Sequence, residues 1–184
     1  MRSYAIVETD LGWVGLMRSN SGLNASTLPQ LRAFAALQHL SPRDGDVDAG
    51  EPSFRSVAKF VRSLLAGRPC DCNERLDLSR GTAFQQTVWL AVRAIAFGRT
   101  RSYGWVAEAI GRPLAAHAVG QAIAGNPLPL FVPCHRVIAA SGELGGYGRG
   151  SEALPAKRSL LRREGIWFPG PTLEQVRGIP QPPV

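Results

Sequence analysis

Apolar residues alternate with polar ones at the start of the chain and then recur at helical spacing. Residues 4–7 and 12–17 are strand-like and separated by a polar turn, which predicts a β-hairpin. Residues 31–40 predict a short helix. Residues 54–65 carry apolar side chains at helical spacing until Gly67 interrupts them. This order of elements predicts a small α/β unit.

Two polar stretches separate this unit from the rest of the chain. Residues 41–52 are acidic and rich in turn formers, so we expect a loop. Residues 67–80 carry a proline, two cysteines and several charges, and they predict a linker. We therefore expect an N-terminal α/β domain with its linker over residues 1–80 and a second domain over residues 81–168. Residues 169–184 are rich in proline with little to bury, which predicts a mobile tail.

The second domain begins with a run of helices. Thr82 and Gln85 have the spacing of a capping box, and an apolar stripe follows until Gly98 ends the helix. Residues 103–110 and 113–124 predict two further short helices joined by a tight glycine turn. Such a pair is typical of a DNA-binding helix-turn-helix, although a helical corner in any small domain has the same pattern.

Small side chains dominate the third of these helices. Such residues let a helix backbone approach a neighbouring helix or the narrow minor groove of DNA. The residues concerned are Ala115, Ala116, Ala118, Val119, Gly120, Ala122 and Ala124. One more helix is expected over residues 155–164, started by a proline and ended by Gly165.

The distribution of charge along the chain favours a polyanionic binding partner. The net charge is +7, and residues 81–184 carry 11 basic and 5 acidic side chains, whereas residues 1–80 carry 10 and 9. A merely soluble basic surface would have the same charge. No apolar run reaches membrane-spanning length, and the N-terminus has no signal pattern, so we expect a cytoplasmic protein without membrane contact.

The three cysteines argue against a disulfide scaffold because the count is low and odd. Cys70 and Cys72 could contribute to a zinc site only if further ligands lay close, and His39 and His117 are the available histidines. Two ordinary thiols in a linker explain this pair more simply. We expect no metal and no other cofactor.

Cys134 offers a different chemistry because His135 follows it directly. A thiolate is the nucleophilic form of cysteine, and a base with a supporting acid can generate it. Glu164 is the candidate acid, since a carboxylate in the last helical turn opposes the helix dipole and such exceptions often mark functional sites. The prolines around residues 127–133 predict a stiff extended lead-in. Cys134 and His135 would then point to opposite sides, and a bridging water or a turn would be required.

A glycine-rich segment follows over residues 141–150, with Tyr147 among its glycines. Glycine leaves backbone N–H groups accessible, so this loop could hold a flat ligand against backbone donors. A surface hairpin without function is the alternative.

Together these motifs resemble the O6-alkylguanine-DNA alkyltransferase family. Pro133-Cys134-His135-Arg136-Val137 resembles its active-site motif, and Gly125-Asn126-Pro127 resembles its hinge. The other matching motifs, in the order of the family, are Arg101-Ser102-Tyr103, Ala118-Val119-Gly120, Gly145-Gly146-Tyr147-Gly148 and Arg163-Glu164-Gly165. The ordered set spans residues 82–168, whereas residues 1–80 fit only loosely the variable N-terminal domain of the family.

The resemblance implies an α+β protein: a small ribonuclease H-like α/β domain, then a mostly helical domain with a winged-helix-like helix-turn-helix. It further implies a monomer that repairs double-stranded DNA by direct reversal. The alkyl group of a flipped O6-alkylguanine would move irreversibly to Cys134, so that each molecule acts once, and O4-alkylthymine is a second candidate substrate.

The resemblance also implies roles for individual residues. Cys134 would be the nucleophile, His135 the base acting through a water, and Glu164 its support, with Asn126 bracing the turn. The implied substrate pocket comprises Tyr103, Pro129, Val137, Tyr147 and Gly148. The implied DNA-contacting residues are Arg101, Ala115, Ala116, His117, Ala118, Gly120 and Gln121. Arg136 would tie the two domains through a charge pair.

His117 departs from the family pattern, which usually has an intercalating arginine at this position. Imidazole is flat and can stack, but it is shorter and carries less charge at neutral pH. We therefore expect weaker DNA affinity, or a pH dependence near neutrality, compared with an arginine.

Three other functions fit parts of the pattern. A non-catalytic binder of alkylated DNA would not need Cys134, and a thiol hydrolase or acyltransferase would not need the basic helical half. A helix-turn-helix regulator would leave the Cys134-His135 pair without a role.

Overall fold

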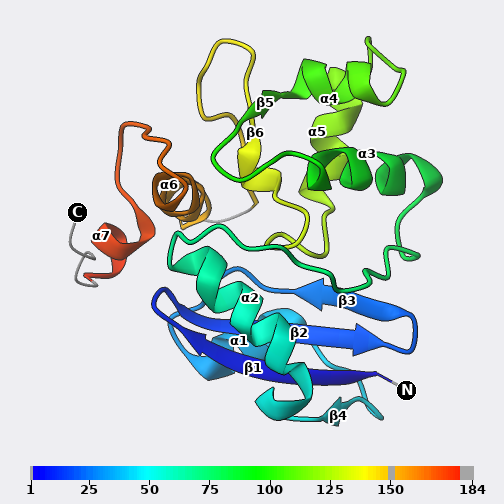
Figure 1. The fold of residues 1–184 in the computed structure, drawn as a ribbon, viewed down its shortest axis with the longest axis vertical. Coiled ribbons are helices and arrows are strands. Elements are labelled where there is room, and N and C mark those ends of the chain that lie inside the picture. Colours follow the sequence, from blue (N-terminus) through cyan, green and yellow to red (C-terminus); the bar gives the residue numbers. More distant parts are fainter. Residues whose placement is uncertain (1, 149–151, 179–184) are drawn as a thin grey trace. The chain divides into compact units, whose positions relative to one another are not determined.

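The computed structural model describes residues 2–148 and 152–178. The chain divides into two compact units, which are coloured in sequence order in Figure 1. The first unit comprises Met1–Arg80 together with Pro127–Leu130, and the second comprises Gly81–Asn126 and Phe131–Val184. The protein is thus of the α+β type, with its larger sheet in the first unit and most of its helices in the second.

The first unit is built on a four-stranded sheet with the order β3-β2-β1-β4. β1 (Ser3–Thr9) and β2 (Gly12–Ser19) pair antiparallel from Ser3↔Arg18 to Thr9↔Gly12, which confirms the predicted hairpin. β3 (Gly22–Ser26) extends the sheet antiparallel to β2, and the short β4 (Val47–Asp48) pairs parallel with β1. The sequence analysis did not predict β3 or β4.

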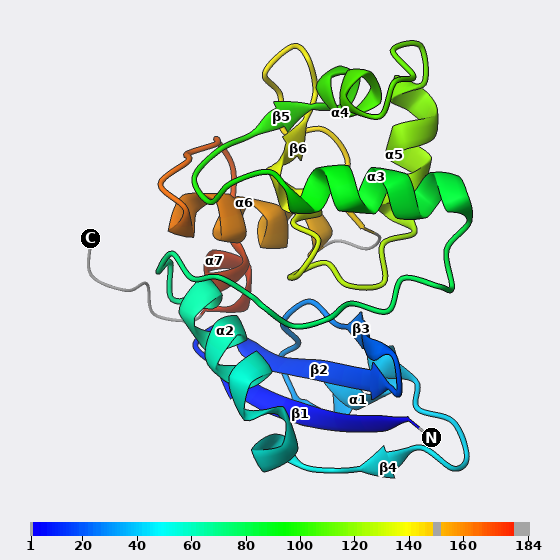
Figure 2. The same cartoon turned by 45° about the vertical axis from the view of Figure 1, so that its right-hand side comes forward.

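Helices α1 (Ala33–Leu40) and α2 (Arg55–Leu65) cover opposite faces of this sheet (Figure 2). A 3-10 turn, η1 (Glu51–Phe54), leads into α2. The predicted apolar stripe of α2 is buried, because side chains at helical spacing meet the sheet on one side only. Its buried members are Val57, Ala58, Val61, Leu64 and Leu65.

In the second unit α3 (Ala83–Arg93), α4 (Tyr103–Ala109) and α5 (Ala116–Ala124) pack against one another. The capping box predicted for α3 is present, with Thr82 and Gln85 each bonding the backbone of the other. The buried Trp89 donates its indole N–H to the Ala122 carbonyl at 2.8 Å and thereby joins α3 to α5. This bond holds α5 against α3.

The third predicted helix is shorter than expected, since residues 112–115 form turns and α5 starts at Ala116. Helix α6 (Ala153–Arg163) begins two residues before Pro155, so the proline lies in its first turn rather than at its start. Both differences leave the order of the elements unchanged.

The lead-in to the cysteine is not extended, contrary to the prediction. Residues 127–133 form turns and bends, and Cys134–Arg136 is a 3-10 turn, η2. The apolar side chains that alternate in this sequence, Leu128, Leu130 and Val132, are nevertheless all buried here. A buried irregular segment and a strand therefore have the same apolar pattern. After η2, β6 (Val137–Ile138) pairs parallel with β5 (Arg101–Ser102).

Residues 169–178 are not the unstructured tail that the sequence analysis expected. Helix α7 (Leu173–Arg177) has a capping box of its own and packs on α6, with Leu173 buried. The buried Ser159 Oγ of α6 donates to Glu174 at 2.5 Å and accepts the Leu173 amide at 2.7 Å. The rest of the predicted tail, residues 179–184, lies outside the described residues. Within residues 2–148 and 152–178 we find no helix that is both long and apolar enough to span a membrane.

Candidate active site

Cys134 begins the 3-10 turn η2 and is 6% exposed. Its amide donates to the Val132 carbonyl at 2.7 Å, and the Arg136 amide donates to the Pro133 carbonyl at 2.9 Å. These short-range bonds turn the chain sharply on both sides of the sulfur. The turn replaces the extended geometry that would have pointed Cys134 and His135 to opposite sides.

Asn126 braces this turn, as the resemblance implied. Its side-chain amide donates to the Val132 carbonyl at 2.8 Å, which ties the end of α5 to the segment before the cysteine. The same side chain also hydrogen-bonds Cys134 and favours its thiolate. The Asn126 side chain, which follows α5, thus contacts both the segment before the cysteine and Cys134 itself.

The thiol of Cys134 is protonated in the resting site. Burial raises its pKa because the charged thiolate loses solvation. Hydrogen bonds from Asn126 and Tyr147 and the positive charge of Lys157 act in the opposite direction but do not overcome burial. A buried thiol of this kind needs a base to become nucleophilic.

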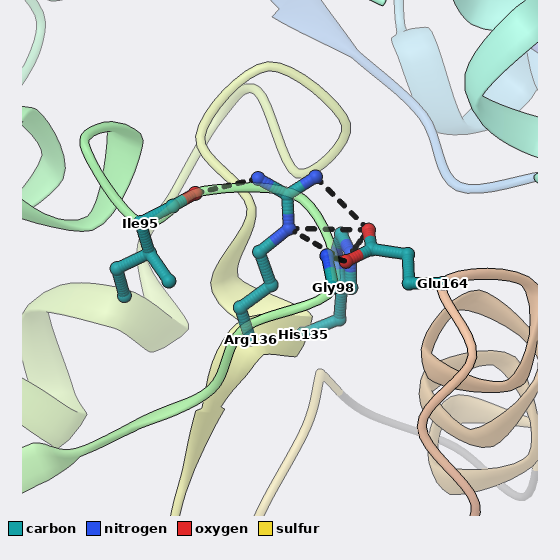
Figure 3. A network of polar contacts seen from close by, with 5 residues as sticks. All are labelled: Ile95, Gly98, His135, Arg136 and Glu164. Atoms are coloured by element: carbon teal, nitrogen blue, oxygen red, sulfur yellow. Dashed lines mark hydrogen bonds and ion pairs between the residues drawn. The ribbon is translucent and has the colours of Figure 1, made fainter. Parts of the chain in front are cut away.

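Glu164, which ends α6, is the hub of a buried polar network (Figure 3). One carboxylate oxygen lies 2.7 Å from His135 Nε2, and the other accepts the Gly98 amide at 3.0 Å. The guanidinium of Arg136 donates to both oxygens at 2.9–3.1 Å. The last-turn acid that opposed the helix dipole is therefore compensated by neighbours from two other segments, η2 and the loop at Gly98.

The protonation of this network fixes the tautomer of His135. The pKa of Glu164 is lowered to about 2, because the bonds and charges of His135 and Arg136 outweigh its burial. An ionised carboxylate only accepts, so Nε2 of His135 carries the hydrogen and Nδ1 has a free lone pair. Nδ1 is buried and has no hydrogen-bond partner among the described residues.

His135 itself is neutral at rest. It is fully buried, and this burial lowers its pKa, although the Glu164 carboxylate opposes the shift. Arg136 and Lys157 lower the pKa further through their charges. A neutral imidazole with an open Nδ1 is ready to accept a proton.

Lys157 is the site residue that sequence reasoning missed. Its ammonium is fully buried and donates to the carbonyls of Val137, Leu144 and Gly146 at 2.6, 2.7 and 3.2 Å. Burial lowers its pKa to about 8. Two signals could have found it: the chain has two lysines only, and Lys157 precedes Glu164 by seven residues, two turns of α6.

The glycine-rich segment contributes Tyr147 to the site. The tyrosine hydroxyl is buried beside Cys134 and has no well-aligned partner among the described residues, and burial raises its pKa well above the ordinary value. The Lys157 ammonium lies 5.6 Å from the centre of its ring. Gly148 is exposed, and Gly150 falls outside the described residues.

Tyr103, at the start of α4, lies between α5 and the glycine-rich segment. Its hydroxyl donates to the Gly146 carbonyl at 3.3 Å. A Cβ on Gly120 would meet its ring at 3.8 Å, and one on Gly145 at 3.3 Å. The two glycines thus leave room for the ring, whose hydroxyl has a pKa raised by burial.

The predicted DNA-contacting residues gather around the start of α5. His117, Ala118 and Gln121 are exposed, and Ala115, Ala116 and Gly120 are half-buried. Arg101 is exposed, and its guanidinium lies 5.0 Å from the Trp105 ring centre. Leu114, which sequence reasoning did not single out, is fully exposed in the turn before α5.

The surroundings of three implied residues, Arg136, Pro129 and Val137, bear on the roles that the resemblance gave them. Arg136 does not pair with the first unit, because its acidic partner Glu164 belongs to the second unit. Pro129 belongs to the first unit, whereas Tyr103, Val137, Tyr147 and Gly148 belong to the second. The carbonyl of Val137, a residue of the implied substrate pocket, already accepts the bond from Lys157.

No cluster of three or more His, Cys, Asp or Glu able to hold a metal occurs within residues 2–148 and 152–178. The Cys70 and Cys72 side chains are both partly exposed, and the Cys70 thiol donates to the Phe60 carbonyl at 3.7 Å.

Comparison with known proteins identifies the family. Residues 83–166 match the family described as 6-O-methylguanine DNA methyltransferase, DNA binding domain. The methylated-DNA–protein-cysteine methyltransferase of Mycobacterium tuberculosis (strain ATCC 25618 / H37Rv) is 38% identical over 164 residues, 89% of this chain and 93% of the relative. The chain belongs to the O6-methylguanine-DNA methyltransferase family. A methyltransferase of the same name from Methanosarcina acetivorans is 36% identical, covering 88% of this chain and 97% of the relative.

Solved structures of O6-methylguanine-DNA methyltransferases are similar over most of the chain. The crystal structure of Mycobacterium tuberculosis OGT in complex with DNA has a TM-score of 0.72 and 37% identity, covering 88% of this chain and 92% of that one. The methyltransferase from Pyrococcus kodakaraensis strain KOD1 has a TM-score of 0.63 at 23% identity, covering 90% and 100%. The latter likeness concerns the fold alone.

Proposed function

We propose that this protein repairs alkylated DNA by moving the alkyl group of O6-alkylguanine irreversibly to Cys134. The observation that carries the proposal is the buried series Cys134, His135 and Glu164, in which Glu164 leaves Nδ1 of His135 open as a base. The activity follows from membership of the methyltransferase family. It is a methylated-DNA–protein-cysteine methyltransferase activity without a metal or organic cofactor.

In the proposed reaction the thiol proton of Cys134 passes through a water to Nδ1 of His135, and Glu164 stabilises the imidazolium that forms. The thiolate then attacks the alkyl carbon. A carbon–sulfur bond forms, the bond from that carbon to O6 breaks, and its electron pair leaves with the guanine, which takes up a proton. The thioether is stable, so the protein acts once.

The substrate pocket is proposed to lie between Tyr103 and the glycine-rich segment. Tyr103 can donate to the departing guanine if its hydroxyl leaves the Gly146 carbonyl. The second lone pair of the Val137 carbonyl and the carbonyl of Cys134 can accept from the guanine amino group. Tyr147 would line the pocket, and Gly148 would offer its amide near O6.

The target base lies inside a duplex, so we propose that it is flipped out before transfer. The second unit would bind as a winged-helix-like helix-turn-helix made of α4 and α5, and the first unit would have a ribonuclease H-like fold. The small residues of α5 would approach the minor groove. Leu114, fully exposed before α5, offers an apolar side chain of the kind that wedges between base steps. A cytoplasmic monomer remains a prediction.

The test is an intact-mass measurement after incubation with a duplex containing labelled O6-methylguanine. One methyl group per protein molecule, mapped to the peptide that contains Cys134, is the expected result. Catalytic release of label over many turnovers would instead indicate a hydrolase. Binding of the duplex without any mass change would indicate a non-catalytic binder or a regulator, and both results would refute the proposal.

His117→Arg is expected to tighten duplex binding several-fold. A guanidinium reaches further than an imidazole and is charged at every relevant pH. The measurement is the affinity for a lesion duplex and the transfer rate at about pH 6 and about pH 8. His39→Arg, an exposed substitution in the first unit, is the control. Equal affinity and rate for His117→Arg and the wild type at both pH values would remove His117 from the interface.

Lys157→Met is expected to slow transfer about 10- to 100-fold at neutral pH. Its positive charge supports the Cys134 thiolate, so its loss raises the pKa of that thiol further. Because the defect lies in deprotonation, the rate should recover as the pH rises. Single-turnover rates across pH test this, with Lys59→Met, the other lysine of the chain and exposed on α2, as the control. A defect that is equal at all pH values would argue against this role.

A further inference from the structure

The Arg136 side chain makes more hydrogen bonds than a single charge pair would need. Its Nε donates to both oxygens of Glu164, at 3.1 and 2.9 Å, and one terminal nitrogen donates to the first of them at 3.0 Å. The other terminal nitrogen donates to the Ile95 carbonyl at 2.6 Å. The guanidinium also lies 5.7 Å from the ring centre of Phe97. Figure 3 shows that His135 and Arg136 converge on the same carboxylate.

The neutral imidazole of His135 and the guanidinium of Arg136 thus both contact a single buried anion, Glu164. The side chain of Glu164 is 1% exposed, so water does not screen the pairs. If Glu164 faced His135 alone, its charge would favour a protonated imidazole, and a protonated imidazole cannot accept a proton from Cys134. Arg136 compensates that charge without removing the contact between Glu164 and His135.

We propose that Arg136 is a positioning residue for the transfer reaction: it holds Glu164 on Nε2 of His135 and, through its charge, keeps the imidazole neutral until the thiol proton arrives. The proposal rests on the proposed function, because it assigns His135 the role of base. The charged groups that act on His135 are Glu164 and Lys157 from α6 and Arg136 from the same 3-10 turn. Of these, Arg136 is the one that also bonds Glu164 directly.

The proposal predicts a change in pH dependence rather than a uniform loss. In Arg136→Gln the amide can still contact Glu164, but the positive charge is gone. The pKa of His135 then rises, so the imidazole becomes protonated and stops acting as a base at a higher pH than in the wild type. The acid limb, which is the fall of the single-turnover rate on the acidic side of the pH profile, should therefore shift to higher pH by about one pH unit, while the rate at high pH is retained. Arg136→Lys keeps the charge, so its acid limb should stay near that of the wild type.

Arg163, the residue before Glu164, offers a matched control. Arg163 pairs with Glu174 at 2.9 Å, and both side chains are as buried as the pair of Arg136 and Glu164. Arg163→Gln removes a comparable buried cation without touching His135. It should lower the stability of the protein and leave the acid limb in place. An unchanged acid limb in Arg136→Gln, or the same shift in Arg163→Gln, would overturn the proposal.

Titration of His135 by NMR provides a readout that needs no transfer and no folded variant. In the wild-type protein the His135 ring should remain neutral to a pH below the ordinary histidine pKa, because burial and the charge of Arg136 lower the pKa of His135. Protonation of His135 at or above that ordinary pKa would refute the role of Arg136. Absence of alkyl transfer with a neutral His135 would refute the proposed function while leaving the Arg136 effect intact.

Discussion

Replacing Cys134 with serine is expected to abolish alkyl transfer and to leave recognition of the lesion duplex intact. A serine hydroxyl is a far weaker acid than a thiol, and the buried site raises the cost of its deprotonation further. Lys157, the cation whose charge acts on residue 134, is committed to three carbonyls and does not convert a hydroxyl into an alkoxide. No measurable methyl group should therefore reach the variant protein.

The fold should tolerate this change. Serine is slightly smaller than cysteine, and Asn126 and Tyr147 remain beside it as hydrogen-bond partners. We expect a change in the free energy of unfolding within about 1 kcal/mol, and duplex affinity close to that of the wild type. The measurements are transfer of label from O6-methylguanine and binding of the same duplex by gel shift.

Cys70 and Cys72 supply the matched control, because they are the other two thiols of the chain and both are partly exposed. The double variant Cys70→Ser, Cys72→Ser should take up one methyl group per molecule, as the wild type does. Label on the Cys134→Ser protein, or loss of uptake in the double variant, would place the acceptor elsewhere. Either result would contradict the proposed function.

The local elements of this chain follow from its sequence because the relevant forces are local. The hairpin of β1 and β2 and the capping box of α3 depend on neighbouring residues, and both are confirmed. The pairing of His135 with Glu164 was implied by the family motifs, which keep these residues in a fixed order.

The parts that could not be predicted depend on tertiary partners. Lys157 is fully buried because three backbone carbonyls converge on it, and no periodicity reveals that convergence. Helix α7 is held by the contact of Ser159 with Glu174, which joins residues fifteen positions apart. Arg136 binds Glu164 rather than the first unit, and only the geometry of η2 decides between these partners.

Replacing Glu164 with glutamine should cause the second large effect, on rate and stability together. The amide cannot compensate the buried charge of Arg136, and breaking one partner of a buried ion pair costs about 3–5 kcal/mol. The neutral amide also no longer fixes the hydrogen of His135 on Nε2 or stabilises the imidazolium. Loss of this base function should slow transfer about 100- to 1000-fold.

The acid side of the stability curve should change as well. The pKa of Glu164 is lowered from 4.5 to about 2 in the folded protein, so this carboxylate stabilises the fold above about pH 4.5 and loses that contribution as the pH falls towards 2. Glutamine does not titrate. The free energy of unfolding of Glu164→Gln should therefore be lower than that of the wild type at neutral pH. As the pH decreases from about 4.5 to about 2, it should fall less steeply than the wild-type value.

Glu174→Gln separates the catalytic effect from the structural one. Glu174 is a second buried carboxylate, bonded to Ser159 and to Arg163, and it does not contact His135. Its substitution should reduce the unfolding free energy while the transfer rate per folded molecule stays near the wild-type value. Thermal unfolding measures the stability of both variants, and single-turnover transfer measures their rates. If both variants lose rate in proportion to stability, then Glu164 has a purely structural role and His135 does not depend on it as a base.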